Sequence, residues 1–396
     1  STGSIDKPLP TLATNVLNLE GGYICNCKAA FDTNVPKSDI RNWNGGAVLD
    51  ASGYGTVNLS GTVIANNTAL DDQGECKHLS CGWNVKKDGV HGNGGGIAMV
   101  RGGVLNITGG IVTGNQSSKY GKGGGIYTSG GVTVNMSGGN LCNNRDDYRT
   151  PGDTYQDRAD EYNQYDGGGG ILIGSNGTLK MTGGQIAGNS GAGGGGIQTT
   201  SGGSELYISG GIIARNLAEV HEGGGLVTVG AGGYAQVIAG GAGTVYVTNN
   251  KTATAYDWGG GGMFCVESAH LVIQSALITG NEAQGFGGGV GGCSNAQIYD
   301  NVGPLTLENG TAVYHNTAAG TGVTNAYYHE YDFDDAGYAL GDPVFTQDKR
   351  YQDYYCEQYS TVKNQMLGGG TSDWVGSYKN TDEDSRTVDF KAEQID

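Results

Sequence analysis

The chain has 396 residues, a formal net charge of −17 and a sequence pI near 4.6. This acidity argues against nucleic acid as a partner, because phosphate binding needs basic patches, and also against docking on an anionic membrane. No apolar run approaches the ~18 residues of a transmembrane helix, so no membrane insertion is expected. Glycine contributes 77 residues, but six prolines and no Gly-X-Y period exclude collagen.

Three segments follow one another along the chain. Residues 1–44 precede the regular pattern and contain Trp43, Cys25 and Cys27; we expect them to form an N-terminal cap. Residues 45–316 carry a repeat. Residues 317–396 are rich in aromatic and acidic residues and are predicted to be a C-terminal cap and tail, because a solenoid must cover its open ends or stack on another copy.

Within the repeat, a run of glycines and one apolar residue recurs about every 27 residues, which indicates a solenoid. Three short apolar stretches separated by glycine turns make up each unit, and strands of this kind predict an all-β, right-handed parallel β-helix of about eight coils. The residues that come after the glycine runs are expected to point inward and stack: Val48, Ile97, Ile126, Ile171, Ile197, Leu226, Met263 and Val290.

Two further inward columns are predicted from the same alignment. The second contains Leu59, Ile107, Met136, Met181, Ile208 and Ile273. The third lies three residues before a recurring asparagine and contains Ile64, Val112, Leu141, Ile186, Ile213, Tyr246, Ile278 and Val313.

The recurring asparagines are interpreted as a structural ladder at a turn, where an interior amide can hydrogen-bond from coil to coil. The members are Asn67, Asn115, Asn144, Asn189, Asn216, Asn249, Asn281 and Asn316. A set of glycan-binding asparagines is the alternative. Asn58, Asn106 and Asn135 begin Asn-x-Ser/Thr triplets inside expected strands and are read as repeat positions.

Two long loops, 68–93 and 145–166, interrupt the repeat at the same phase. Loops at one phase of a solenoid emerge from one edge, and their bases are expected about 10 Å apart, given a coil spacing of ~4.8 Å. Aromatic rings beside carboxylates suit sugar rings and hydroxyl groups. We therefore predict ligand binding by residues of the two loops and by Tyr120 on the short turn between them; the loop residues are Trp83, His91, Tyr148, Tyr155, Tyr162 and Tyr165.

Other interpretations of these loops remain open. They could pack on each other as a lateral brace, or their oxygens could bind Ca²⁺, although no 12-residue calcium-loop signature is present, and no cofactor is expected. A glycoside hydrolase or polysaccharide lyase would use paired loop carboxylates, for which the candidates are Asp88, Asp160, Glu161 and Asp166. A non-enzymatic role is preferred, since no pectinase-type motif occurs. The eight cysteines show no zinc pattern and could be free thiols or disulfides.

The pairing of Gly-Gly-[Gly/Ala]-Ile with apolar-x-x-Asn resembles the GGAI and FxxN repeats of polymorphic outer-membrane proteins. It is also similar to the right-handed β-helix modules in large surface proteins of gut Firmicutes; here Ile, Val or Leu replaces the aromatic of FxxN. The resemblance covers 45–316 and implies an extracellular or cell-surface, adhesin-like or structural module. Its expected partner is a host or environmental glycan or surface protein. A self-assembling filament or surface-layer subunit, associating end to end, is an alternative.

Overall fold

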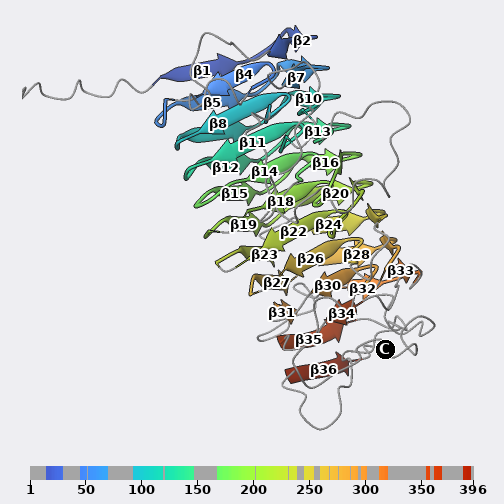
Figure 1. Ribbon diagram of the computed structural model, residues 1–396. Helices are drawn as coiled ribbons and strands as arrows, with labels where there is room; N and C mark the ends of the chain where they lie inside the picture. Colours follow the sequence, from blue (N-terminus) through green and yellow to red (C-terminus); the bar gives the residue numbers. More distant parts are fainter. Residues whose placement is uncertain are drawn as a thin grey trace, which may run out of the picture.

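The structure is a stack of β-strand coils, in which each coil pairs in parallel with the coils before and after it (Figure 1). This computed structural model describes residues 15–29, 45–50, 52–69, 92–118, 121–146, 167–200, 202–230, 232–238, 245–253, 259–266, 268–274, 276–285, 287–292, 296–300, 312–319, 354–356, 361–367 and 387–393. No helix occurs among these residues, and hence none that could cross a membrane. The predicted parallel β-helix is confirmed.

Each coil passes through three long sheets in turn, here called sheets I, II and III. Sheet I contains β4 (Val48–Asp50), β8 (Ile97–Val100), β11 (Ile126–Ser129), β14 (Ile171–Ile173), β18 (Ile197–Thr199), β22 (Leu226–Val229), β26 (Met263–Val266), β30 (Val290–Gly292) and β34 (Tyr354–Cys356). Sheet II contains β1 (Val16–Leu19), β5 (Thr56–Leu59), β9 (Val104–Ile107), β12 (Thr133–Met136), β15 (Thr178–Met181), β19 (Glu205–Ile208), β23 (Tyr234–Ile238), β27 (His270–Gln274), β31 (Gln297–Asp300), β35 (Thr361–Leu367) and β36 (Thr387–Glu393).

Sheet III contains β2 (Tyr23–Cys25), β6 (Val63–Ala65), β10 (Ile111–Thr113), β13 (Asn140–Cys142), β16 (Gln185–Ala187), β20 (Gly211–Ala214), β24 (Val245–Thr248), β28 (Ala276–Thr279) and β32 (Ala312–Tyr314). Within the described residues, eight coils, from β4–β5–β6 to β30–β31–β32, have a strand in all three sheets.

A fourth, short ladder lies between sheet III and the next coil's sheet I, whereas the sequence indicated only three strands per coil. Its two-residue strands are β3 (Lys28–Ala29), β7 (Thr68–Ala69), β17 (Ser190–Gly191), β21 (Leu217–Ala218), β25 (Lys251–Thr252), β29 (Glu282–Ala283) and β33 (Thr317–Ala318). Isolated bridges join Thr68 to Gln116, Gln116 to Arg145 and Arg145 to Ser190, so the ladder continues between β7 and β17. A strand of two residues is too short to show a period in the sequence.

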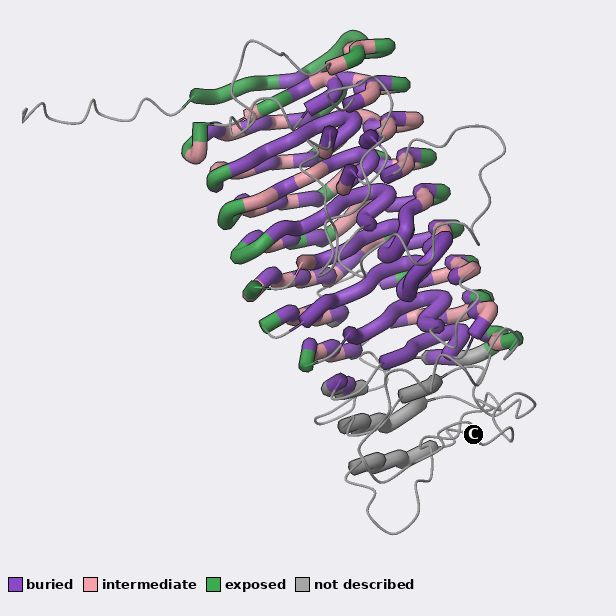
Figure 2. The backbone as a smooth tube through the Cα atoms, in the orientation of Figure 1, coloured by how far each residue is buried: buried purple, intermediate pink, exposed green. Residues whose placement is uncertain are grey.

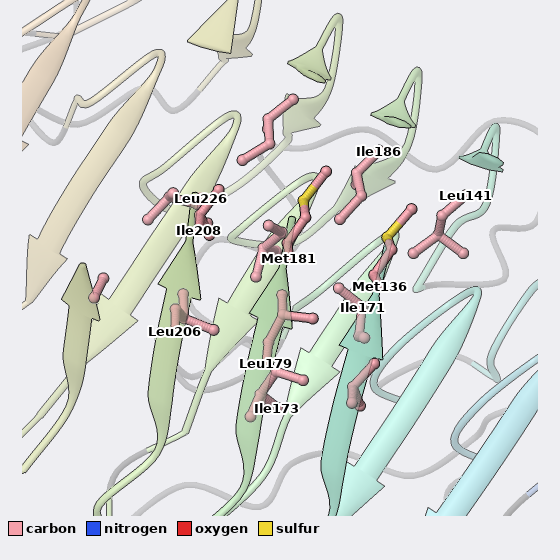
Figure 3. Packing of buried hydrophobic residues seen from close by; sticks show 14 of the residues in the cluster. Met136, Leu141, Ile171, Ile173, Leu179, Met181, Ile186, Leu206, Ile208 and Leu226 are labelled. Atoms are coloured by element: carbon pink, nitrogen blue, oxygen red, sulfur yellow. The ribbon is translucent and has the colours of Figure 1, made fainter. Parts of the chain in front are cut away.

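The three inward columns form the core (Figures 2 and 3). The residues after the glycine runs pair in register from Val48 to Val290 and are buried, as predicted. One member of the third column is wrong: Tyr246 points outward and is 41% exposed, while Val247 is buried and pairs with Ile213. Successive strand residues face opposite sides, so an alignment error of one residue reverses the side chain.

The asparagine ladder is buried and continuous from Asn67 to Asn316. Each side-chain amide from Asn67 to Asn281 donates to the Oδ1 of the next member at 2.8–3.0 Å. Every member also donates to a backbone carbonyl of the preceding coil. Each Oδ1 also accepts a backbone N–H, as in the 3.0 Å bond from Asn144 N to Asn189 Oδ1. The predicted member Asn249 is wrong, because Asn250 takes its place between Asn216 and Asn281. A buried amide that satisfies both donors and its acceptor explains a structural asparagine at this position.

The three glycines of a run have different structural roles. Gly123 adopts φ +65, which a side chain rarely tolerates. A methyl group on Gly124 would overlap the backbone of Arg145 in the short ladder. A Cβ on Gly125 would lie 2.6 Å from the carbonyl oxygen of Gly170 and 2.9 Å from the amide of Asn144. The glycine run is thus required by the close approach of the chain to the asparagine ladder.

The repeat extends beyond the limits drawn from the sequence. β1, β2 and β3 lie within the predicted N-terminal cap, yet they pair in register with β5, β6 and β7, so the segment from Val16 to Ala29 belongs to the coil pattern. Leu17 aligns with the buried Val57 but is 43% exposed. At the other end, β34, β35 and β36 extend sheets I and II into the predicted C-terminal cap.

Candidate functional site

Both long insertions leave the coil at the same place. The chain before the first ends in β7, and the chain before the second passes through Arg145; both lie in the short ladder. Gln116 is the single rung between them, so the two departure points are about 10 Å apart at ~4.8 Å per rung. The insertions therefore share one edge of the solenoid, between the short ladder and sheet I.

The predicted ligand-binding and catalytic residues lie outside the described part of the chain. These are Trp83, His91, Tyr120, Tyr148, Tyr155, Tyr162 and Tyr165 for binding, and Asp88, Asp160, Glu161 and Asp166 for catalysis. They stay predictions. The flanking residues of the predicted loops belong to the ordered coil, so the first insertion is defined as residues 70–91 and the second insertion as residues 147–166.

Hydrogen bonds to neighbouring coils fix the end of the first insertion. Gly92 N donates to Ser118 Oγ at 2.8 Å, and Ser118 N donates back to Gly92 O at 2.9 Å. One residue later, Lys122 N donates to Asn93 Oδ1 at 2.8 Å. Ser118 is almost fully buried. The chain therefore re-enters the solenoid at a defined point.

The second insertion is also anchored at both ends. Asp146 is 2% exposed, and both of its carboxylate oxygens accept from Ala192 N at 3.1 Å. At the far end, Gly123 N donates to Gly167 O at 3.1 Å. A carboxylate that accepts from a backbone N–H in a buried setting forms a comparatively strong bond. Insertions with fixed ends lose less conformational freedom when they bind a ligand.

An ion pair braces the same edge. Arg145 Nη2 lies 2.9 and 3.1 Å from the two carboxylate oxygens of Glu219, which is two coils further along. The Glu219 side chain is 6% exposed and that of Arg145 29% exposed. Glu219 begins a short turn that also contains His221 and Glu222, both buried. The pair thus connects the base of the second insertion to a buried polar turn.

Sequence reasoning missed this turn. Residues 219–222 read Glu-Val-His-Glu, where the preceding coil has Ala192 and Gly193. The sequence did contain a signal for this turn, because two acids and a histidine stand at a position of the repeat where the preceding coil has small residues. Within the described residues, no group of three or more His, Cys, Asp or Glu side chains is arranged to hold a metal ion.

Four cysteines are free thiols: Cys25, Cys27, Cys142 and Cys265. Cys265 is buried, and its thiol donates to Ala269 O at 3.0 Å. Cys27 takes the asparagine position in the first coil and donates its backbone N–H to Asn67 Oδ1. Cys25 and Cys142 occupy the same outward position of sheet III in different coils.

Comparisons of the chain with protein-family models, with curated proteins and with solved structures gave no match. The interpretation of function therefore depends on the geometry of this edge and on the composition of the insertions.

Proposed function

We propose that this chain is an extracellular, adhesin-like recognition module that presents its two insertions to a glycan. The observation that carries the proposal is that both insertions leave the short ladder from positions two rungs apart. Two recognition segments so close together can contact one ligand at the same time. Their tyrosines and acids supply the apolar faces and hydrogen-bond acceptors that sugars need.

The anchoring of the insertion ends also supports this role. Ser118 holds the end of the first insertion, and Asp146 holds the start of the second. Such anchors reduce the entropy that is lost on binding, which favours a recognition role on a rigid scaffold. A spacer would not need buried polar groups at this edge, where each costs desolvation.

A glycan array with the full chain tests the proposal. We expect binding to a restricted set of glycans. The key variant replaces residues 147–166 by one alanine, which copies the Gly191–Ala192–Gly193 connection of the next coil. This variant should lose at least about 10-fold in affinity and keep its thermal midpoint.

A scrambled second insertion of the same composition is the matched control, and it should also lose binding. Failure of the intact protein to bind any glycan, or equal binding by the shortened variant, would refute the proposal. Capture of a protein ligand without any glycan would replace it with protein recognition.

A further inference from the structure

The outward face of sheet II carries a compact patch of aromatic and polar side chains. In the strand register, Lys180, Tyr207 and Gln236 form one outward row across β15, β19 and β23. Glu205, Tyr234 and His270 form the adjacent row across β19, β23 and β27. All six side chains are at least partly exposed. Neighbours in a row are about 4.8 Å apart, so the patch is small enough to lie under one or two sugar rings.

The two tyrosines form the centre of the patch. Their ring centroids are 5.8 Å apart, and the ring planes are inclined by 52°. Partial burial raises the pKa of Tyr207, with further contributions from the charge of Glu205 and a hydrogen bond to that carboxylate. Burial and then Glu205 also raise the pKa of Tyr234. Glu205 therefore holds one ring in place while the rings keep an accessible face.

A row of asparagine amides leads to this patch from the N-terminal end. Asn58 Nδ2 donates to Asn18 Oδ1 at 2.7 Å, Asn106 to Asn58 at 2.8 Å, and Asn135 to Asn106 at 2.9 Å. Asn135 pairs in register with Lys180, so the amides and Tyr207 lie in one outward row along the solenoid. Asn58, Asn106 and Asn135 each use one of their two side-chain N–H groups in this row, which leaves the other available to a ligand.

The face is also nearly neutral. The chain has a net charge of −17, yet Lys180 and Glu205 are the only Lys, Arg, Asp or Glu among the described outward side chains of sheet II, and their charges cancel. An anionic polymer would be repelled by the remainder of the molecule, and a cationic polymer would be drawn to acidic segments elsewhere. Aromatic rings with amides and little net charge suit an uncharged ligand that has both C–H faces and hydroxyl groups.

We propose that the outward face of sheet II binds an uncharged polysaccharide chain, with sugar rings on Tyr207 and Tyr234 and hydroxyl groups on the asparagine row. This site is separate from the insertions. Within each coil the order is sheet I, sheet II, sheet III and short ladder, and the insertions lie between the short ladder and the next sheet I. The polysaccharide runs along the solenoid axis, parallel to the row.

Affinity electrophoresis of the full chain tests this site. The gels contain a neutral β-glucan, galactomannan or dextran, and matched gels contain alginate or polygalacturonate. We expect retardation by at least one neutral polymer and by neither acidic one. The double variant Tyr207→Ala/Tyr234→Ala should bind about 10-fold more weakly or worse, through loss of two aromatic contacts. The matched control is Tyr246→Ala, which removes an exposed tyrosine from sheet III and should bind like the parent.

Asn106→Ala provides a second variant that leaves the tyrosines intact, and it should weaken binding by about threefold through loss of ligand hydrogen bonds. The variant with a shortened second insertion should keep full affinity, which separates this site from the proposed glycan site at the insertions. Retardation by acidic polymers alone, or by no polymer, would overturn the inference. Equal losses in the Tyr246→Ala control and the double variant would do so as well.

Discussion

Asn249 and Asn250 are adjacent in the chain but occupy different environments. Asn249 is exposed and has φ 55, the same left-handed backbone as Asn66 and Asn143 one residue before their ladder positions. Asn250 is buried and accepts from both the backbone N–H and the side-chain amide of Asn216 at 3.0 Å. One residue supplies the turn and the other supplies the ladder.

Substitution should therefore lower the free energy of unfolding much more at Asn250 than at Asn249. Asn250→Ala leaves the amide of Asn216 and the carbonyl of Ile213 without their partners, and each buried unpaired group costs about 1–3 kcal/mol. We expect a loss of roughly 3 kcal/mol or more in the free energy of unfolding, measured by urea denaturation. Asn249→Gly should change it by less than about 1 kcal/mol, because glycine adopts the left-handed backbone without strain. Similar losses for both variants would contradict this assignment.

The glycine run gives a second prediction. Gly124→Ala should lower the free energy of unfolding by about 2–3 kcal/mol, because the methyl group would overlap the backbone of Arg145. Gly21→Ala is the matched control, since no atom lies within 4 Å of the position that its methyl group would take. Comparison of the two thermal midpoints gives the result. An unchanged midpoint for Gly124→Ala would mean that the short ladder can move away from the glycine run.

Removing only the arginine of the Arg145–Glu219 ion pair should destabilise the protein more than neutralising both side chains. Arg145→Met removes the guanidinium partner of a nearly buried carboxylate, and we expect the free energy of unfolding to fall by about 1–3 kcal/mol, reduced from the fully buried case by the partial exposure of the arginine. Adding Glu219→Gln should recover part of that loss. A double-mutant cycle in urea measures the coupling. Additive effects of the two substitutions would show that the two charges do not stabilise each other.

The two tyrosines of the patch should make the free energy of unfolding fall as the pH rises through the alkaline range. The pKa values of Tyr207 and Tyr234 are raised in the folded protein, so the unfolded chain releases these protons first. The stability they contribute is fully present below pH ~10 and is lost as pH rises through the raised values. Tyr207→Phe/Tyr234→Phe should therefore show a shallower fall in thermal midpoint between about pH 10 and pH 11. Parallel curves for parent and variant would contradict the raised values.

The architecture can be predicted from the sequence because glycine, aliphatic and asparagine residues recur in fixed columns. For Ile97, Ile126 and Ile171, the residue type and the spacing are sufficient to predict that the side chains point inward. The sequence Val-Tyr-Val-Thr-Asn-Asn is different, because either asparagine fits the column and the choice changes which face Tyr246 occupies. Only pairing with the neighbouring coils decides between them.

The described polar groups at the insertion edge were harder to foresee. Arg145 and Glu219 are 74 residues apart, and nothing in either local sequence indicates that they meet. The patch around Tyr207 was missed for a related reason. Its members come from four strands, and they become neighbours only through the register of sheet II.

Backbone hydrogen bonds between coils run along the solenoid axis, because paired strands lie side by side across it. Tension applied to the two ends would act along these bonds and peel the terminal coil away before the next one is loaded. We expect extension in steps, each releasing one coil. A coil without a long insertion has roughly 27 residues and would release on the order of 90 Å of slack, whereas a coil that carries an insertion would release more. Single-molecule pulling would reveal such a series of steps, whereas a sideways load would be shared by many coils. The solenoid would thus resist bending, and under axial tension it would dissipate mechanical energy by releasing one coil at a time.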